Sequence, residues 1–172
     1  MQHRVMVESL YHPGESKFRE DGLVICDPFY GVLDGTSEAY SPSKPQRRFE
    51  HGLTGGEMVS RTTERVIASA DTGMDLGAVL EVASELVAGI HVSMKVPFAS
   101  DELAGATFAV AKVRNGTVDV IQVGDCFVLV CLRSGHRYLT TNQVHAHETE
   151  MHAHIKAIME ELARDDGVAL ET

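Results

Sequence analysis

The chain has 172 residues, of which 44% are hydrophobic, and this length and composition predict one globular domain with a substantial core. Asp and Glu outnumber Lys and Arg by 25 to 15, giving a net charge of -10 that disfavours binding to nucleic acid. Three cysteines without CxxC spacing exclude a complete disulfide framework and favour a cytoplasmic location. We recognise no secretory leader and no apolar segment of membrane-spanning length, so we expect no membrane partner.

Strand patterns come first in the chain. Alternation of apolar and polar side chains over residues 3–10 predicts a half-buried strand at a sheet edge, ended by Pro13 and Gly14. Two apolar runs follow, one ending at Cys26 and the next beginning at Phe29. Because only two residues separate these runs, we expect them to pair as a hairpin.

Acidic residues gather at the open end of this hairpin. Glu20 and Asp21 begin its first strand, and Asp34, followed by Gly35, ends its second. Three clustered carboxylates suit a hard divalent cation such as Mg²⁺ or Mn²⁺ better than they suit zinc. Acid-glycine pairs are also common in turns, so turn formation alone is the alternative interpretation.

The next segment changes from loop to helix. Residues 37–53 contain prolines, basic side chains and few apolar ones, which predicts an exposed loop, either solvated or acting as a flap over an anionic substrate. Capping-box spacing at Thr54 and an apolar stripe predict a helix over residues 55–70. A more regular stripe predicts a second helix from Asp75 to just before Pro97. Its core-facing residues are expected to be Leu76, Val79, Leu80, Ala83, Leu86, Val87, Ile90 and Met94.

The second half predicts antiparallel strands and then a helix. Asn-Gly and Ser-Gly turns join successive strand patterns as hairpins. The strands are expected over residues 106–113, 117–123, 126–132 and 136–140, and a helix over residues 144–163. Because helices and antiparallel strands are segregated, this order predicts an α+β fold and not a parallel doubly wound one.

Histidines are frequent in the last helical pattern. The acidic and histidine residues there are His145, His147, Glu148, Glu150, His152 and His154. Glutamate and histidine four residues apart share one face of a helix. The group is either a solvated helix face, the interpretation we favour, or a Zn²⁺ or Ni²⁺ site.

Several short motifs follow one another between about residue 15 and about residue 155. They are the Glu20-Asp21 pair, the strand Phe29–Gly35 that ends in Asp-Gly, the helix start Gly56–Arg61, the strand Gly105–Val110 with Gly-Ala-Thr, the turn Val123–Cys126 with Val-Gly-Asp-Cys, and Leu139-Thr140. In their order and spacing these motifs resemble the metal-dependent type 2C protein phosphatases.

The resemblance implies a fold, a cofactor and a substrate. The fold would be a layered αββα sandwich of two antiparallel sheets flanked by helices. A two-metal Mg²⁺ or Mn²⁺ centre would activate water to hydrolyse phosphoserine or phosphothreonine in a phosphoprotein. Asp34 would bridge the two cations, with Glu20 and the Gly35 carbonyl on one of them. Asp21 would support this shell, and Asp125 would approach a further metal position.

The sequence also departs from the family. Ser16 stands where many members carry a phosphate-binding arginine, which leaves Lys17 and Arg19 as candidate phosphate ligands. The family's second Asp-Gly strand and final Asp-Asn are not recognised, because Asp166-Gly167 follows a polar run. We therefore expect a single domain over residues 1–172 that is incomplete at its C-terminus. It is either a phosphatase with an incomplete metal site or an inactive binding or regulatory module, and self-association could cover an open sheet edge.

Overall fold

The computed structural model describes residues 6–10, 19–37, 47–97, 103–141, 143–144 and 149–157. The elements in chain order are β1 (Gly22–Cys26), β2 (Phe29–Thr36), the short 3-10 helix η1 (Glu50–Gly52), α1 (Gly55–Ser69), α2 (Leu76–Ser93), β3 (Gly105–Arg114), β4 (Thr117–Val123), β5 (Leu129–Cys131) and β6 (Arg137–Leu139).

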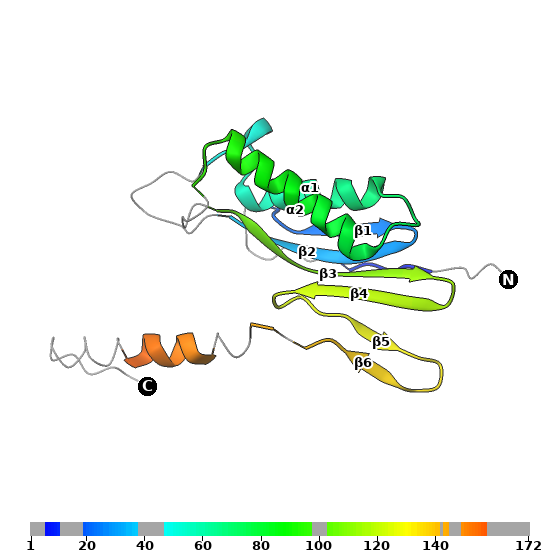
Figure 1. Ribbon diagram of the computed structural model, residues 1–172. Coiled ribbons are helices and arrows are strands. Elements are labelled where there is room, and N and C mark those ends of the chain that lie inside the picture. Colours follow the sequence, from blue (N-terminus) through cyan, green and yellow to red (C-terminus); the bar gives the residue numbers. More distant parts are fainter. Residues whose placement is uncertain are drawn as a thin grey trace.

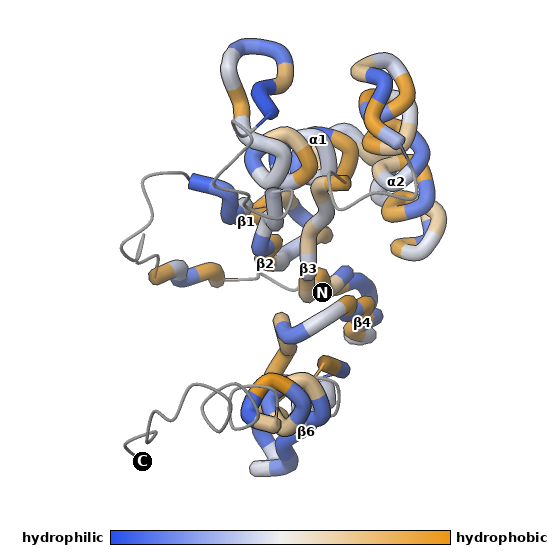
Figure 2. The backbone as a smooth tube through the Cα atoms, turned by 90° about the vertical axis from the view of Figure 1, so that its left-hand side faces the viewer, coloured by the Kyte–Doolittle hydropathy of each residue, from blue (hydrophilic) through white to orange (hydrophobic). Residues whose placement is uncertain are grey.

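The strands form two antiparallel sheets. One has four strands in the order β1-β2-β3-β4, and the other consists of β5 and β6. Figure 1 shows α1 and α2 together on one side of the large sheet and the β5–β6 hairpin beyond β4. The side view in Figure 2 shows the same layers. The prediction of an α+β fold with two antiparallel sheets and helices is confirmed.

The helices begin where the sequence predicts. In α1 the Thr54 hydroxyl accepts a hydrogen bond from the Glu57 amide at 3.1 Å, and the Glu57 carboxylate accepts one from the Thr54 amide at 2.9 Å. In α2 the Asp75 carboxylate caps the helix by accepting hydrogen bonds from two backbone amides of the first turn. Both caps satisfy donors that the start of a helix would otherwise leave unpaired.

The main core lies between the helices and the large sheet. Its fully buried side chains are Val24, Phe29, Leu33, Ile67, Leu76, Val79 and Val110. Alternate residues of β2 face this core, so Leu33 and Gly35 are buried while Asp34 between them is exposed on the other face. β2 therefore packs under α1 through Leu33 and Gly35, and it presents the Asp34 carboxylate on the face away from the helix.

A second core cluster fixes the segment before α1. Phe49 is buried with Met58, Val59 and Val96, and its ring meets the His91 ring edge-on with centroids 5.9 Å apart. The sequence predicts an exposed loop over residues 37–53, but a buried aromatic anchor makes residues 47–53 part of the packed structure. Residues 38–46 of that loop lie outside the described residues.

Two expectations for α2 need correction. Leu86, expected in the core, is 50% exposed, because the apolar stripe is wider than the surface that α1 and the sheet cover. By length and composition the 18 residues of α2 could also cross a membrane, contrary to the expectation that no segment could. In the structure α2 packs on the core through Leu76, Val79 and Ala83.

The two ends of the chain also differ from the prediction. Residues 6–10 of the expected strand 3–10 form no strand and are exposed. Residues 149–157 of the expected helix 144–163 are helical, but Val144 lies in a bend. Met151 and Ile155 of the helical part are exposed rather than buried. A helical period predicts the helix, but it does not provide a partner surface.

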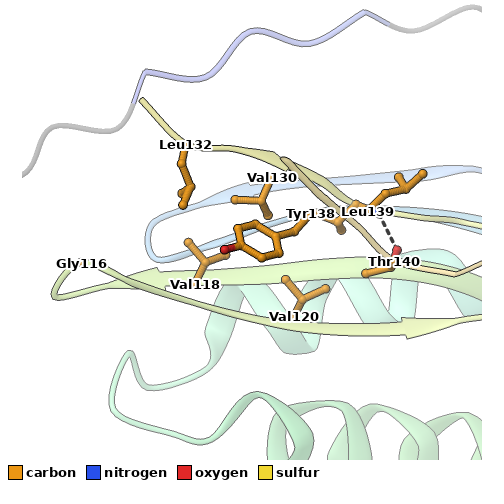
Figure 3. Close-up of a pocket in the computed structure, with 9 residues that line it drawn as sticks. Gly116, Val118, Val120, Val130, Leu132, Tyr138, Leu139 and Thr140 are labelled. Carbon is orange, nitrogen blue, oxygen red and sulfur yellow. Dashed lines mark hydrogen bonds between the residues drawn. The ribbon is translucent and has the colours of Figure 1, made fainter. Parts of the chain in front are cut away.

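The β5–β6 hairpin encloses an apolar pocket with β4, with a volume of about 360 Å³. Its strands are shorter than predicted, at three residues each. Figure 3 shows the Tyr138 ring between the valines of β4, Val118 and Val120, and Val130 of β5. The pocket therefore lies between the second sheet and the face of the large sheet that the helices do not cover.

Candidate metal centre

The candidate site is built around Asp34, one residue before the buried Gly35 near the end of β2. In the β2–β3 register Asp34 lies opposite Thr107. Directly opposite residues of antiparallel strands place their side chains on the same face. Asp34 and Thr107 therefore share the face of the sheet that lies away from α1.

Two glycines let the start of α1 approach the end of β2. A methyl group at Gly35 would lie 2.5 Å from the Gly56 carbonyl oxygen and 2.6 Å from the Ser60 hydroxyl oxygen. A methyl group at Gly56 would lie 2.9 Å from both the Gly35 carbonyl oxygen and the carboxyl carbon of Glu20. Since both atoms adjoin the same point, the Glu20 carboxylate and the Gly35 carbonyl lie next to each other.

Two serines fix Glu20 in this position. The Ser37 hydroxyl donates to the Glu20 carboxylate and accepts a hydrogen bond from the Gly56 amide at 3.1 Å. The Ser60 hydroxyl donates to the Glu20 backbone carbonyl at 2.5 Å. We did not predict either serine, although Ser60 follows Gly56 by four residues and so shares its helix face.

Asp125 reaches the same region from the turn after β4. The Thr107 hydroxyl donates a hydrogen bond to the Asp125 carboxylate at 2.9 Å. The turn depends on Gly124, whose φ of 83° favours glycine and whose amide donates to the Gln143 side-chain oxygen at 3.1 Å. Thr107 therefore lies opposite Asp34 and holds Asp125, a role that the sequence did not reveal.

We call Glu20, Asp21, Asp34 and Asp125 the carboxylate cluster. Partial burial is the main cause that raises the pKa of Asp34 above its usual value, followed by the charges of Asp21 and Asp125, a hydrogen bond with Asp21, and the charge of Glu20. Within the described residues, no basic side chain forms an ion pair with any member of the cluster. Among the described residues, the negative charge of the cluster therefore has no basic ion-pair partner.

The donor chemistry of the cluster fits a hard divalent cation. Carboxylate and carbonyl oxygens are the ligands that Mg²⁺ and Mn²⁺ prefer, and a cation would offset the repulsion around Asp34. Within the described part of the chain, no three acidic, histidine or cysteine side chains lie close enough together to hold an ion.

The neighbouring Cys126 does not provide a nucleophile. Its sulfur lies 3.4 Å from the Thr107 hydroxyl oxygen. Burial is the main cause that raises the pKa of the Cys126 thiol; the hydrogen bond with Thr107 opposes it, and the charges of Asp125, Asp34 and Asp21 add to it. A protonated thiol is a poor nucleophile, so the raised pKa makes Cys126 a poor candidate for that role.

For the other predicted ligands, the described part of the chain shows no contact with the cluster. Lys17 lies outside the described residues, and Arg19 is exposed. In the histidine-rich segment, residues 145–148 lie outside the described residues, while Glu150, His152 and His154 are exposed on the helical part. Within the part of the chain that the structure describes, they form no group that could hold a metal.

Comparisons with known proteins give a partial structural likeness. No family model matches the sequence, and no curated protein is significantly similar to it. The serine/threonine phosphatase PstP/Ppp of Mycobacterium tuberculosis matches with a TM-score of 0.48 and 20% identity, over 74% of this chain and 49% of its own. The PPM Ser-Thr phosphatase MsPP of Mycobacterium smegmatis, solved with cacodylate, matches with a TM-score of 0.46 and 18% identity, over 73% and 47%.

Both of these solved proteins are serine/threonine phosphatases. The chain spans about half the length of each structure that it matches.

Proposed function

We propose that the carboxylate cluster is the divalent-cation site of a metal-dependent serine/threonine phosphatase-like protein that hydrolyses phosphomonoesters. One observation carries the proposal. Acidic side chains from the start of the β1–β2 hairpin and from the turn after β4 lie near enough to Asp34 for their charges to raise its pKa, and no basic side chain of the described residues forms an ion pair with them. Uncompensated carboxylates at one point are typical of cation sites.

Each part of the chain has a role in this proposal. Asp34, Glu20 and the Gly35 carbonyl would hold Mg²⁺ or Mn²⁺, with Asp21 and Asp125 beside them. Such cations, when bound, would lower the pKa of a bound water and neutralise phosphate oxygens. Ser37 and Ser60 hold Glu20 in place.

The opposite side of the site is held by the sheet. Thr107 orients Asp125, and the β2–β3 register keeps Asp34 beside both of them. Hydrogen bonds of this kind limit the motion of the groups that ligate a cation.

A catalytically inactive binding or regulatory module is the second candidate. The observation that favours it is that no three potential ligands converge in the described residues. A site that holds one cation loosely could still bind a phosphorylated partner without providing the second cation that supports in-line attack.

One experiment separates the two functions. Mn²⁺ binding is measured by calorimetry, and hydrolysis of an aryl phosphate and a phosphothreonine peptide is followed in the same buffer. The wild type is compared with Asp34→Asn and with Asp119→Asn, which removes an exposed carboxylate from β4, away from the cluster. We expect Asp34→Asn to reduce Mn²⁺ affinity by roughly tenfold or more, and Asp119→Asn to leave it unchanged.

The combined results decide between the candidates. Mn²⁺-dependent hydrolysis that is lost in Asp34→Asn supports the phosphatase. Binding at Asp34 without hydrolysis supports the inactive module. Equal Mn²⁺ affinity in the wild type and Asp34→Asn would reject the metal site and both candidates with it.

A further inference from the structure

A second concave surface lies where α1 meets the segment around η1 and the end of α2. It is a groove of about 690 Å³ between the segment around η1, the outer face of α1 and the end of α2. Three arginines line it, Arg48, Arg61 and Arg65, above an apolar floor that includes Leu53, Met58 and Met94. We call this surface the arginine groove. Its volume is in the range that accommodates a few side chains of a ligand.

The wall formed by residues 47–53 is fixed in place. Phe49 is buried in the core, and its amide donates to the Leu53 carbonyl at 2.9 Å. A guanidinium nitrogen of Arg47 donates to the Met94 carbonyl at 3.1 Å, which ties the wall to the end of α2. His51 has a φ of 60°, so the turn adopts a strained left-handed conformation. A preformed wall reduces the entropy that binding must overcome.

The groove has more basic than acidic side chains, since three arginines and one glutamate, Glu50, line it. The whole protein carries a net charge of -10. Glu57, the acidic neighbour of Arg61, accepts the capping hydrogen bond of α1 and lies 3.9 Å from the Arg61 guanidinium. Arg65 forms no ion pair with any described residue. Arg61 and Arg65 are four residues apart on one helix face, so both can reach the same anionic group.

The apolar floor of the groove favours a peptide over a nucleic acid as its ligand. Phe49 and Met58 are each 5% exposed, and Leu53 and Met94 are half-buried at the floor of the groove. A nucleic-acid backbone would contact the arginines but would leave this floor uncovered, and the net charge of the chain opposes it. A peptide can place an apolar side chain on the floor and acidic side chains against the arginines.

We propose that the arginine groove docks an extended, acidic segment of a partner protein, with an apolar side chain of the partner on the Met58 and Met94 floor. The arginines would bind carboxylates or a phosphate of the segment through charge-assisted hydrogen bonds. None of the groove residues belongs to the carboxylate cluster. The inference therefore stands whether or not that cluster hydrolyses phosphate.

The test uses fluorescence anisotropy with a short labelled peptide of alternating glutamate and leucine. A second peptide has glutamine in place of glutamate, a third has alanine in place of leucine, and a fourth has phosphoserine in place of the central glutamate. We expect the first peptide to bind, the second and third to bind more weakly, and Arg61→Gln/Arg65→Gln to lower the affinity for the first by about tenfold or more.

Arg133→Gln/Arg137→Gln is the matched control. It removes the same charge from two exposed arginines of the β5–β6 hairpin and should bind the first peptide like the wild type. The fourth peptide shows whether phosphate or carboxylate is preferred. Equal loss in both double variants, unchanged binding in Arg61→Gln/Arg65→Gln, or no binding of either anionic peptide would overturn the proposal. Binding of a labelled oligonucleotide in preference to the peptides would overturn it as well.

Discussion

Thr107 donates a hydrogen bond to the Asp125 carboxylate at 2.9 Å and lies opposite Asp34 in the β2–β3 register. Thr107 on the inner strand β3 is thus next to both the acidic residue of β2 and the acidic residue of the turn after β4. The relationship exists only because β3 pairs with β2 on one side and with β4 on the other.

Thr107→Val should weaken Mn²⁺ binding while the fold remains. The valine keeps the shape of the side chain but leaves Asp125 without its donor, a loss of about 1 kcal/mol, or roughly fivefold in affinity. Calorimetry with Mn²⁺ measures the change. Thr117→Val is the control, because the Thr117 hydroxyl donates to the Arg114 carbonyl at 2.7 Å at an exposed turn. Equal Mn²⁺ affinities for the two variants would show that Thr107 has no special part in the site.

Gly56→Ala should destabilise the protein and disturb the site, whereas Gly89→Ala should not. An alanine methyl group at position 56 would lie 2.8 Å from the Gly35 carbonyl carbon and 2.9 Å from the Glu20 carboxyl carbon. Backbone atoms cannot move away cheaply, so we expect a loss of about 1–3 kcal/mol. Gly89 in α2 has open space around it, and alanine there should add up to about 1 kcal/mol through helix propensity.

Thermal unfolding followed by circular dichroism measures both changes. If Gly56→Ala is as stable as the wild type, the close approach of α1 to β2 is not required, and the account of how Glu20 and the Gly35 carbonyl meet is wrong.

Features set by neighbouring residues could be predicted from the sequence. The cap at Thr54, the two helices and the β1–β2 hairpin all follow from local spacing, and the hairpin alone brings Glu20 and Asp21 to Asp34. Features set by tertiary contacts could not be predicted in this way. The contacts of Ser37 and Ser60 with Glu20 need the docking of α1 on β2, and no local pattern specifies that docking.

The same distinction explains the errors. Phe49 lies in a polar segment rich in proline and basic residues, so nothing local predicts its burial against His91. Met151 and Ile155 have the spacing of a buried helix face, yet they are exposed because spacing does not create a covering surface. Asp125 could be assigned to the site only through the family resemblance, since β3 and β4 must pair before its turn approaches Asp34.

Asp34→Asn should stabilise the metal-free protein at neutral pH. The raised pKa of Asp34 means that the folded state holds its proton more tightly than the unfolded state, so the ionised carboxylate destabilises the fold above that pKa. The site is solvent-accessible, which limits the gain to at most about 1 kcal/mol. The gain should shrink as the pH falls through the raised pKa, because the wild-type group then becomes neutral too.

Urea unfolding of both proteins in a chelator, at neutral and mildly acidic pH, measures this difference. A wild type that is the more stable of the two at neutral pH would show that repulsion within the carboxylate cluster is not significant.

His91 should make the stability of the protein depend on pH below about 6.5, the ordinary pKa of histidine. Burial is the main cause that lowers the pKa of His91, the nearby Arg47 charge acts in the same direction, and a hydrogen bond with the Val87 backbone opposes them. Its Nε2 accepts a hydrogen bond from the Ala104 amide at 3.3 Å, which requires that nitrogen to be unprotonated.

The direction in which pH changes the free energy of unfolding depends on whether the folded or the unfolded state takes up the proton first. Above pH 6.5 the ring is neutral in both states, so the contribution of His91 to stability is fully present. As the pH falls, the unfolded state is protonated first, and the free energy of unfolding decreases by at most about 1.4 kcal/mol per pH unit until the lowered pKa of the folded state is reached.

His91→Gln keeps an acceptor near Ala104 but cannot take up a proton, so the stability of this variant should depend less on pH. His136→Gln, at an exposed histidine of the β5–β6 hairpin, should keep the slope of the wild type. Unfolding measured from pH 7.5 down to pH 5 tests this, and an identical slope in all three proteins would show that His91 does not couple folding to protonation.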